Sequence, residues 1–155
     1  MALSPQLISA AAIYYVCADL NAEGYCATKV DNMPGWHVQT LIDGEQVNIE
    51  VRSTSRIVEN EDYGGKPHFV FQTYGEDAKR NRRSIAANRD LVAFVYAGPH
   101  DAVRIGWRPY SQSKQRVIKF PVSSEPKTRR RKARVSLSDN TFQEALEMLF
   151  RDLAA

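Results

Sequence analysis

Residues 47–55, V-N-I-E-V-R-S-T-S, constrain the fold more than any other stretch of the sequence. Apolar and polar residues alternate along it, which predicts a β-strand with one buried face. Glu50 and Arg52 share the polar face, about 7 Å apart along the strand. An Asp-Gly turn immediately before the stretch predicts a hairpin, with residues 36–42 as its first arm. Glu50 and Arg52 are either part of a functional site or an ion pair at the sheet surface. A surface ion pair stabilises a protein by less than about 1 kcal/mol.

The remaining pattern predicts an α/β (α+β) protein with a mixed central β-sheet flanked by helices. Ser4 and Pro5 are a favourable cap and first residue for a helix that ends near Asn21. Residues 91–96 are continuously apolar, which is typical of a central strand buried on both faces. Other strands are expected at residues 25–30, 69–71, 103–107 and 116–122, a loop at 57–66, and a helix from Ser138 or Asn140 to about Leu153.

A length of 155 residues is that of one domain. We expect a core domain over residues 1–122, a basic loop or linker over 123–135, and a C-terminal helix over 136–155 that packs on the core. Two cysteines and three scattered histidines lack the spacing of a zinc site. His68 and His100 lie beside prolines and are expected at the surface. Without an apparent signal peptide or an apolar run of membrane-spanning length, the protein is expected to be cytoplasmic, with no membrane association.

Positive charge is concentrated in the second part of the chain. Residues 1–62 hold 3 Lys and Arg against 9 Asp and Glu, whereas residues 63–155 hold 18 against 9. This asymmetry favours a nucleic-acid-binding protein, because phosphate neutralisation supplies much of the affinity for DNA. The alternative is a solvated loop and a flexible basic tail. The residues predicted to contact phosphates are Lys79, Arg80, Arg82 and Arg83 in a first cluster and Lys127, Arg129, Arg130, Arg131, Lys132 and Arg134 in a second.

Four segments, in this order, resemble the PD-(D/E)XK nuclease superfamily, in particular its intron-endonuclease-like and Holliday-resolvase-like branches. They are A-A-A-I-Y-Y-V-C-A-D-L-N-A-E-G-Y at 10–25, G-W-H-V at 35–38, I-E-V-R-S-T at 49–54 and D-L-V-A-F-V-Y at 90–96. The resemblance spans about residues 9–107. It implies the restriction-endonuclease-like fold, DNA as the partner, and a homodimer, since such nucleases often cut two strands with two subunits.

The resemblance also implies a catalytic centre of Glu50, Arg52 and His37, with Glu50, His37 and the carbonyl of Val51 as ligands of Mg²⁺ or Mn²⁺. Glu50 matches the superfamily's glutamate, but His37 stands where an aspartate is expected and Arg52 where a lysine is expected. Ile13 replaces a helix glutamate. Imidazole is a poor ligand for Mg²⁺, although it suits other divalent ions. Arginine stays protonated, so it cannot act as a base, but it can clamp a phosphate.

Three functions are compatible with this sequence. The first is a DNA-binding protein on a nuclease-like fold with a degenerate centre. The second is an active metal-dependent endonuclease with a variant His/Glu/Arg centre, in which Asp31 or Asp43 could replace the absent aspartate. The third is a phage or plasmid interaction protein that inhibits a nucleic-acid-handling enzyme.

Overall fold

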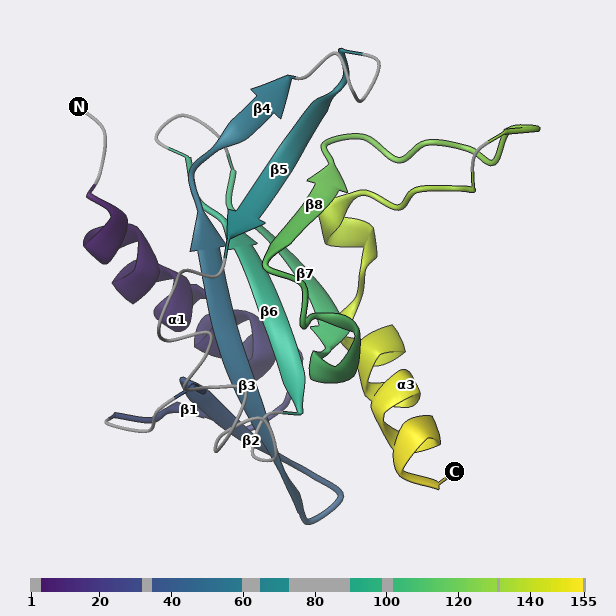
Figure 1. Ribbon diagram of the computed structural model, residues 1–155. Helices are drawn as coiled ribbons and strands as arrows, with labels where there is room; N and C mark the ends of the chain where they lie inside the picture. The colour runs from purple at the N-terminus through teal and green to yellow at the C-terminus, as the bar shows by residue number, and fades with distance from the viewer. Residues whose placement is uncertain are drawn as a thin grey trace.

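The computed structural model describes residues 4–31, 35–59, 65–72, 90–98, 102–130 and 132–154 (Figure 1). The chain opens with helix α1 (Pro5–Ala22), for which Ser4 is the N-cap. Then follow β1 (Ala27–Lys29), β2 (Val38–Ile42), β3 (Glu45–Thr54), β4 (Ile57–Glu59), β5 (Pro67–Gln72), β6 (Leu91–Tyr96), β7 (Arg104–Pro109), the 3₁₀ turn η3 (Tyr110–Gln112), β8 (Val117–Pro121), the 3₁₀ turn η4 (Leu137–Asp139) and helix α3 (Phe142–Ala154).

Five strands form a mixed sheet in the order β1-β2-β3-β6-β7. Strands β3 and β6 run parallel, and the other neighbours are antiparallel. The predicted hairpin is confirmed, with Val38 opposite Ile49. Its turn residues Asp43 and Gly44 have φ angles of 51° and 82°, the left-handed conformation that a two-residue hairpin turn requires. Strand β3 therefore lies inside the sheet, with a neighbour on each side.

A second, antiparallel sheet has the order β4-β5-β8. The expected loop over residues 57–66 is wrong at its start, because β4 pairs there with β5, with Ile57 opposite Phe69. Three residues are too few to show an alternating pattern, so only the pairing with β5 reveals this strand. No helix in the described part of the chain has the length and hydropathy needed to cross a membrane.

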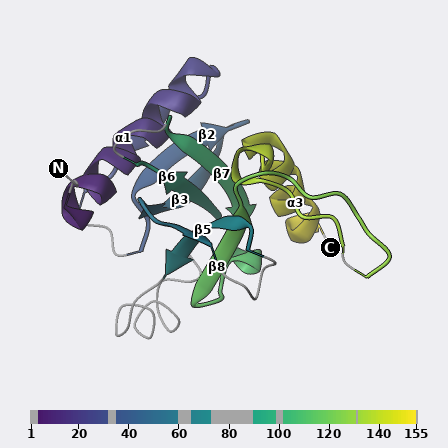
Figure 2. The ribbon, with the colours of Figure 1, turned by 90° about the horizontal axis from the view of Figure 1, so that it is seen from above.

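The mixed sheet has an apolar core on each face. Figure 2 shows α1 on one side of it and strands β5 and β8 on the other. The helix-side core joins both helices to the sheet and includes Val16, Ile49 and Trp107. The opposite core is aromatic, with Phe94 on β6 packed 5.0 Å from Phe120 on β8 between ring centroids. Every residue of β6 is buried, as the continuous apolar run predicts.

The 3₁₀ turn η4, which precedes helix α3, lies close to Gly106 on β7. A Cβ at this position would clash with the carbonyl oxygen of Leu137, so glycine lets η4 lie directly on the strand. The helix begins at Phe142, and Thr141 caps it by accepting a 3.2 Å hydrogen bond from the amide of Glu144. The cap is therefore not at Ser138 or Asn140, as the sequence pattern predicts, because η4 and the residue after it precede the helix.

Candidate functional site

Glu50 and Arg52 form an ion pair on the face of β3 that points toward the second sheet. Glu50 Oε2 lies 3.1 Å from Arg52 Nη2, and the two side chains are only 8% and 9% exposed, respectively. The guanidinium carbon of Arg52 lies 5.6 Å from the centroid of the Phe94 ring. The interpretation of Glu50 and Arg52 as an exposed surface ion pair is wrong, because the second sheet and its aromatic core also cover this polar face of β3.

The Arg52 guanidinium is incompletely satisfied. Its Nε atom is buried and has no hydrogen-bond partner within the described residues. A buried donor without an acceptor costs about 1–3 kcal/mol, so the pairing with Glu50 is the main compensation for burying this cation. In this arrangement the guanidinium faces Glu50 and Phe94 and presents little surface to a phosphate.

His37 precedes β2, and its imidazole continues the hydrogen bonding of the hairpin. The amide of Val51 donates to His37 Nδ1 at 3.0 Å, while the amide of His37 donates to the carbonyl oxygen of Ile49 at 2.8 Å. An Nδ1 atom that accepts a hydrogen bond carries no proton, so the neutral ring holds its proton on Nε2. Neither nitrogen then offers a lone pair to a metal ion.

These residues do not fit a divalent cation as they lie. Glu50 is the one carboxylate of the predicted set, and the positive charge of Arg52 stands beside it. In the regions that the structure describes, no three His, Cys, Asp or Glu side chains group closely enough to hold a metal. Mg²⁺ needs oxygen ligands in octahedral geometry, commonly from one or two carboxylates. The predicted metal set of Glu50, His37 and Val51 would have to rearrange before it could bind one.

The proposed replacements for the missing aspartate do not join Glu50 in this arrangement. Asp31 follows Val30, whose amide donates to the carbonyl oxygen of His37 at 2.9 Å. The Asp31 side chain, however, is 74% exposed and pairs with Lys29 at 3.3 Å. Asp43 occupies the hairpin turn, six residues from His37 along an extended strand and therefore about 20 Å away. Ile13 packs against the helix-side core, where a glutamate would be costly to bury.

Asp90 is a carboxylate beside this site that the sequence patterns do not single out. It precedes β6 and exchanges hydrogen bonds with Asn48, whose amide donates to Asp90 Oδ2 at 2.8 Å. Burial raises the pKa of Asp90, and the hydrogen bond from Asn48 lowers it by a smaller amount. The register of β3 with β6 places Asp90 next to Asn48, on the face that carries Glu50.

The raised pKa of Asp90 predicts a measurable pH dependence. The folded state holds this proton at a higher pH than the unfolded chain does, so the stability contributed by the neutral acid is lost as pH rises through the folded pKa. Asp90→Asn keeps an acceptor for Asn48 without the charge, and it should gain stability relative to wild type between pH 3.5 and 7. Urea unfolding across this range measures the difference, with Asp31→Asn as the exposed control. A constant difference at all pH values would contradict the effect.

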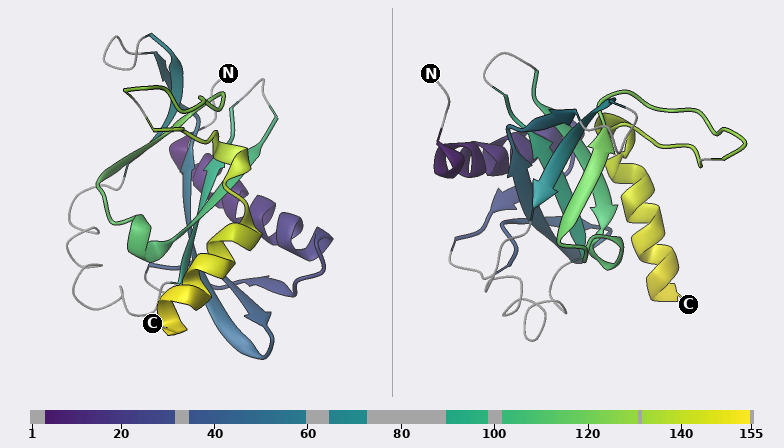
Figure 3. Two further views of the ribbon diagram at one scale, coloured as in Figure 1. Left: turned by 90° about the vertical axis from the view of Figure 1, so that its right-hand side faces the viewer. Right: turned by 45° about the horizontal axis from the view of Figure 1, so that its top comes forward.

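We call residues 123–135 the basic arm. It leaves the body after β8, extends away from it and returns to η4 (Figures 1 and 3). Glu125 and Arg134 close its base with two backbone hydrogen bonds of 2.7 and 3.0 Å. The described basic residues beyond this base are exposed: Lys127, Arg129, Arg130 and Lys132. Arg131 and the first predicted cluster, Lys79, Arg80, Arg82 and Arg83, lie outside the described residues.

His68 anchors the arm and corrects the expectation that it lies at the surface. It is fully buried on β5, with its Nδ1 atom 2.9 Å from the carbonyl oxygen of Lys66. Its Nε2 atom lies 3.3 Å from Arg134 Nη1, so a neutral ring with its proton on Nδ1 accepts from the guanidinium. The histidine is buried because β8 and the return of the arm cover it, contacts that come from distant parts of the chain. His100 is outside the described residues.

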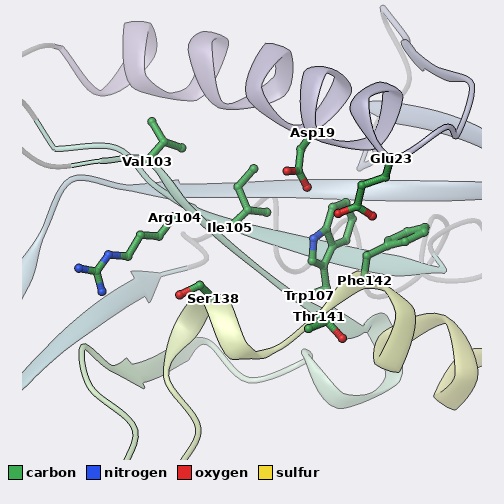
Figure 4. Close-up of a pocket in the computed structure, with 9 residues that line it drawn as sticks. All are labelled: Asp19, Glu23, Val103, Arg104, Ile105, Trp107, Ser138, Thr141 and Phe142. Atoms are coloured by element: carbon green, nitrogen blue, oxygen red, sulfur yellow. The ribbon is translucent and has the colours of Figure 1, made fainter.

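A pocket of about 410 Å³ opens on the helix side of the mixed sheet, between α1, β7 and the start of α3 (Figure 4). Asp19 and Glu23 extend from α1 toward Trp107 at its wall. Burial raises the pKa of Asp19. The lining also includes Arg104, so the pocket carries charges of both signs.

Comparison with known proteins supports the fold. No protein-family model matches the sequence, and no curated protein matches it. The structure is similar to a bacterial homing endonuclease, I-Ssp6803I, with a TM-score of 0.58 and 16% identity over 97% of this chain and 95% of that one. A Holliday junction resolvase, Hjc of Archaeoglobus fulgidus, aligns with a TM-score of 0.36 and 12% identity over 85% and 86% of the two chains. The chain therefore has the restriction-endonuclease-like fold that its sequence motifs predict.

Proposed function

We propose that the protein binds DNA on a nuclease-like fold whose catalytic centre is closed by the buried Glu50–Arg52 ion pair. That ion pair is the observation on which the proposal rests. Its oxygen-to-nitrogen distance of 3.1 Å and its burial mean that Arg52 balances the negative charge of Glu50, the residue that matches the superfamily's glutamate.

The neighbouring groups support a centre without hydrolytic activity. Arg52 is a permanent cation and cannot accept a proton from water. The Nδ1 lone pair of His37 accepts a hydrogen bond from the Val51 amide, so in this arrangement Nδ1 holds the hairpin backbone and does not act as a general base. Among the described residues, no three His, Cys, Asp or Glu side chains lie close enough together to hold a metal ion beside a general base.

Binding is assigned to the basic clusters. The exposed side chains of the basic arm supply the charge that attracts phosphates, and the fold is that of proteins acting on DNA. Lys79, Arg80, Arg82 and Arg83 are proposed as further phosphate contacts from their sequence alone. A homodimer remains a prediction and is measurable by light scattering.

The test combines binding and cleavage on single-stranded, duplex and four-way-junction DNA, with Mg²⁺, with Mn²⁺ and with neither. We expect binding that weakens as salt rises, and no nicking with either metal. Cleavage by the wild type that disappears in Glu50→Gln, with circular dichroism confirming that the variant is folded, would favour instead the active endonuclease with Glu50, His37 and Arg52. Absence of binding to all three DNAs would refute the proposed function.

A further inference from the structure

We propose that the basic arm enters the major groove of duplex DNA as a two-stranded ribbon, so that the protein prefers a double helix over a single strand. This rests on the proposed DNA binding and specifies its ligand and its contact. The argument comes from the shape of the arm, the way its base is held, and the residues that it carries.

The arm is a loop whose two segments are paired at the base by an antiparallel bridge. The two segments of the arm run out and back together, and the paired backbones of Glu125 and Arg134 hold them in antiparallel register at the base. Figures 1 and 3 show the arm extending beyond the sheets from which it arises. The major groove of B-form DNA is about 12 Å wide and admits a two-stranded β-ribbon.

The base is tied to the body from both sides. On the β5 side, Arg134 contacts buried His68 and Lys66 pairs with Glu125 at 3.7 Å. On the η4 side, the Ser124 hydroxyl donates to Asp139 Oδ2 at 2.8 Å and accepts from the amide of Ser136 at 2.9 Å. Because its base is already ordered, the basic arm loses less conformational entropy when it binds, and this preorganisation favours binding.

The residues between Glu125 and Arg134 favour duplex DNA over single-stranded DNA as the ligand. Residues 126–133, P-K-T-R-R-R-K-A, contain five Lys and Arg, no acidic residue and no aromatic residue. Single-stranded sites typically combine positive charge with aromatic rings on which bases stack. Arg and Lys in the major groove contact both phosphates and the guanine O6 and N7 acceptors. A basic ribbon without a stacking residue therefore fits a groove better than a row of unpaired bases.

The experiment uses the full chain and one DNA sequence, offered as a duplex and as a single strand. Arg129→Ala/Arg130→Ala removes two charges from the arm but leaves Arg134, which anchors the base. Arg116→Ala/Arg151→Ala removes two exposed charges elsewhere and is the matched control. Binding is measured from 50 to 200 mM salt, with circular dichroism to confirm that each variant is folded.

We expect the arm variant to lower the salt slope on the duplex by about 0.9 to 1.8, at about 0.9 for each of the two side chains that contacts a phosphate, and to leave the slope on the single strand unchanged. The control should change neither slope. Methylation of guanine N7 in the duplex should weaken the wild type and have little effect on the arm variant, because N7 lies in the major groove.

Equal losses on duplex and single strand, or no effect of N7 methylation, would overturn the groove contact. An unchanged duplex slope in the arm variant would remove the arm from the interface. In each of these results the wild type still binds DNA and the proposed function stands. Failure of the wild type to bind any DNA would instead remove the proposed function.

Discussion

Replacing Glu50 with alanine is expected to lower the free energy of unfolding by about 3–5 kcal/mol, the loss typical of a buried ion pair that is deprived of one partner. The variant keeps the Arg52 cation buried beside the aromatic core. Among the contacts described, the Phe94 ring is then the remaining group that interacts with its charge. Its Nε atom is already a buried donor without an acceptor, so little remains to compensate the desolvation of the guanidinium. Chemical denaturation at neutral pH measures the loss.

Two further variants identify the cause. Glu45→Ala removes an exposed carboxylate from the start of the same strand and should change stability by less than about 0.5 kcal/mol. Glu50→Leu/Arg52→Met replaces the pair by apolar side chains of similar volume, and it should recover most of the stability, because neither charge is then buried alone. A loss below about 1 kcal/mol in Glu50→Ala would show that the pair is solvated in solution, like a surface ion pair.

The parts of the fold that were predictable are those with a local signal. The strand predicted from alternation at β3, the Asp-Gly turn and the buried run of β6 each depend on neighbouring residues. The structure confirms all three elements, although both faces of β3 are covered and not just one. The motif order also predicted the restriction-endonuclease-like fold. These features are readable because strand period and turn geometry leave a pattern within a few residues.

The surroundings of the candidate site had no such signal. Glu50 and Arg52 alternate with apolar residues as exposed side chains would, and only the packing of the second sheet buries them. His68 is buried by β8 and by Arg134, which is 66 positions away in the sequence. Asp90 lies beside the site because its carboxylate accepts a hydrogen bond from the amide of Asn48, 42 positions away in the sequence. Burial of a polar group depends on which distant segment of the chain covers it, so the local periodicity of the sequence does not predict that burial.

The Mn²⁺ affinity of the centre is expected to increase by about a hundredfold or more in His37→Asp/Arg52→Met, compared with a wild type that binds Mn²⁺ weakly. The variant places a second carboxylate on the hairpin beside Glu50 and removes the cation that lies 3.1 Å from it. Two unit charges 4 Å apart interact by about 4 kcal/mol at the effective dielectric of a protein, equivalent to about a thousandfold in affinity. Some of this gain is lost in ordering the new ligands, which is why the expected increase is smaller.

Calorimetry and electron paramagnetic resonance of Mn²⁺ measure this affinity without any cleavage assay. The aspartate at position 37 keeps an acceptor for the Val51 amide, so the hairpin should persist, and circular dichroism checks that it does. His37→Asp alone is the control: it adds the carboxylate but retains Arg52, whose guanidinium can pair with both acids, so its gain should be much smaller. If the wild type binds Mn²⁺ tightly and Glu50→Ala abolishes that binding, the ion pair opens to admit the metal. His37, Glu50 and Val51 would then be its ligands, and the closed centre on which the proposed function rests would be wrong.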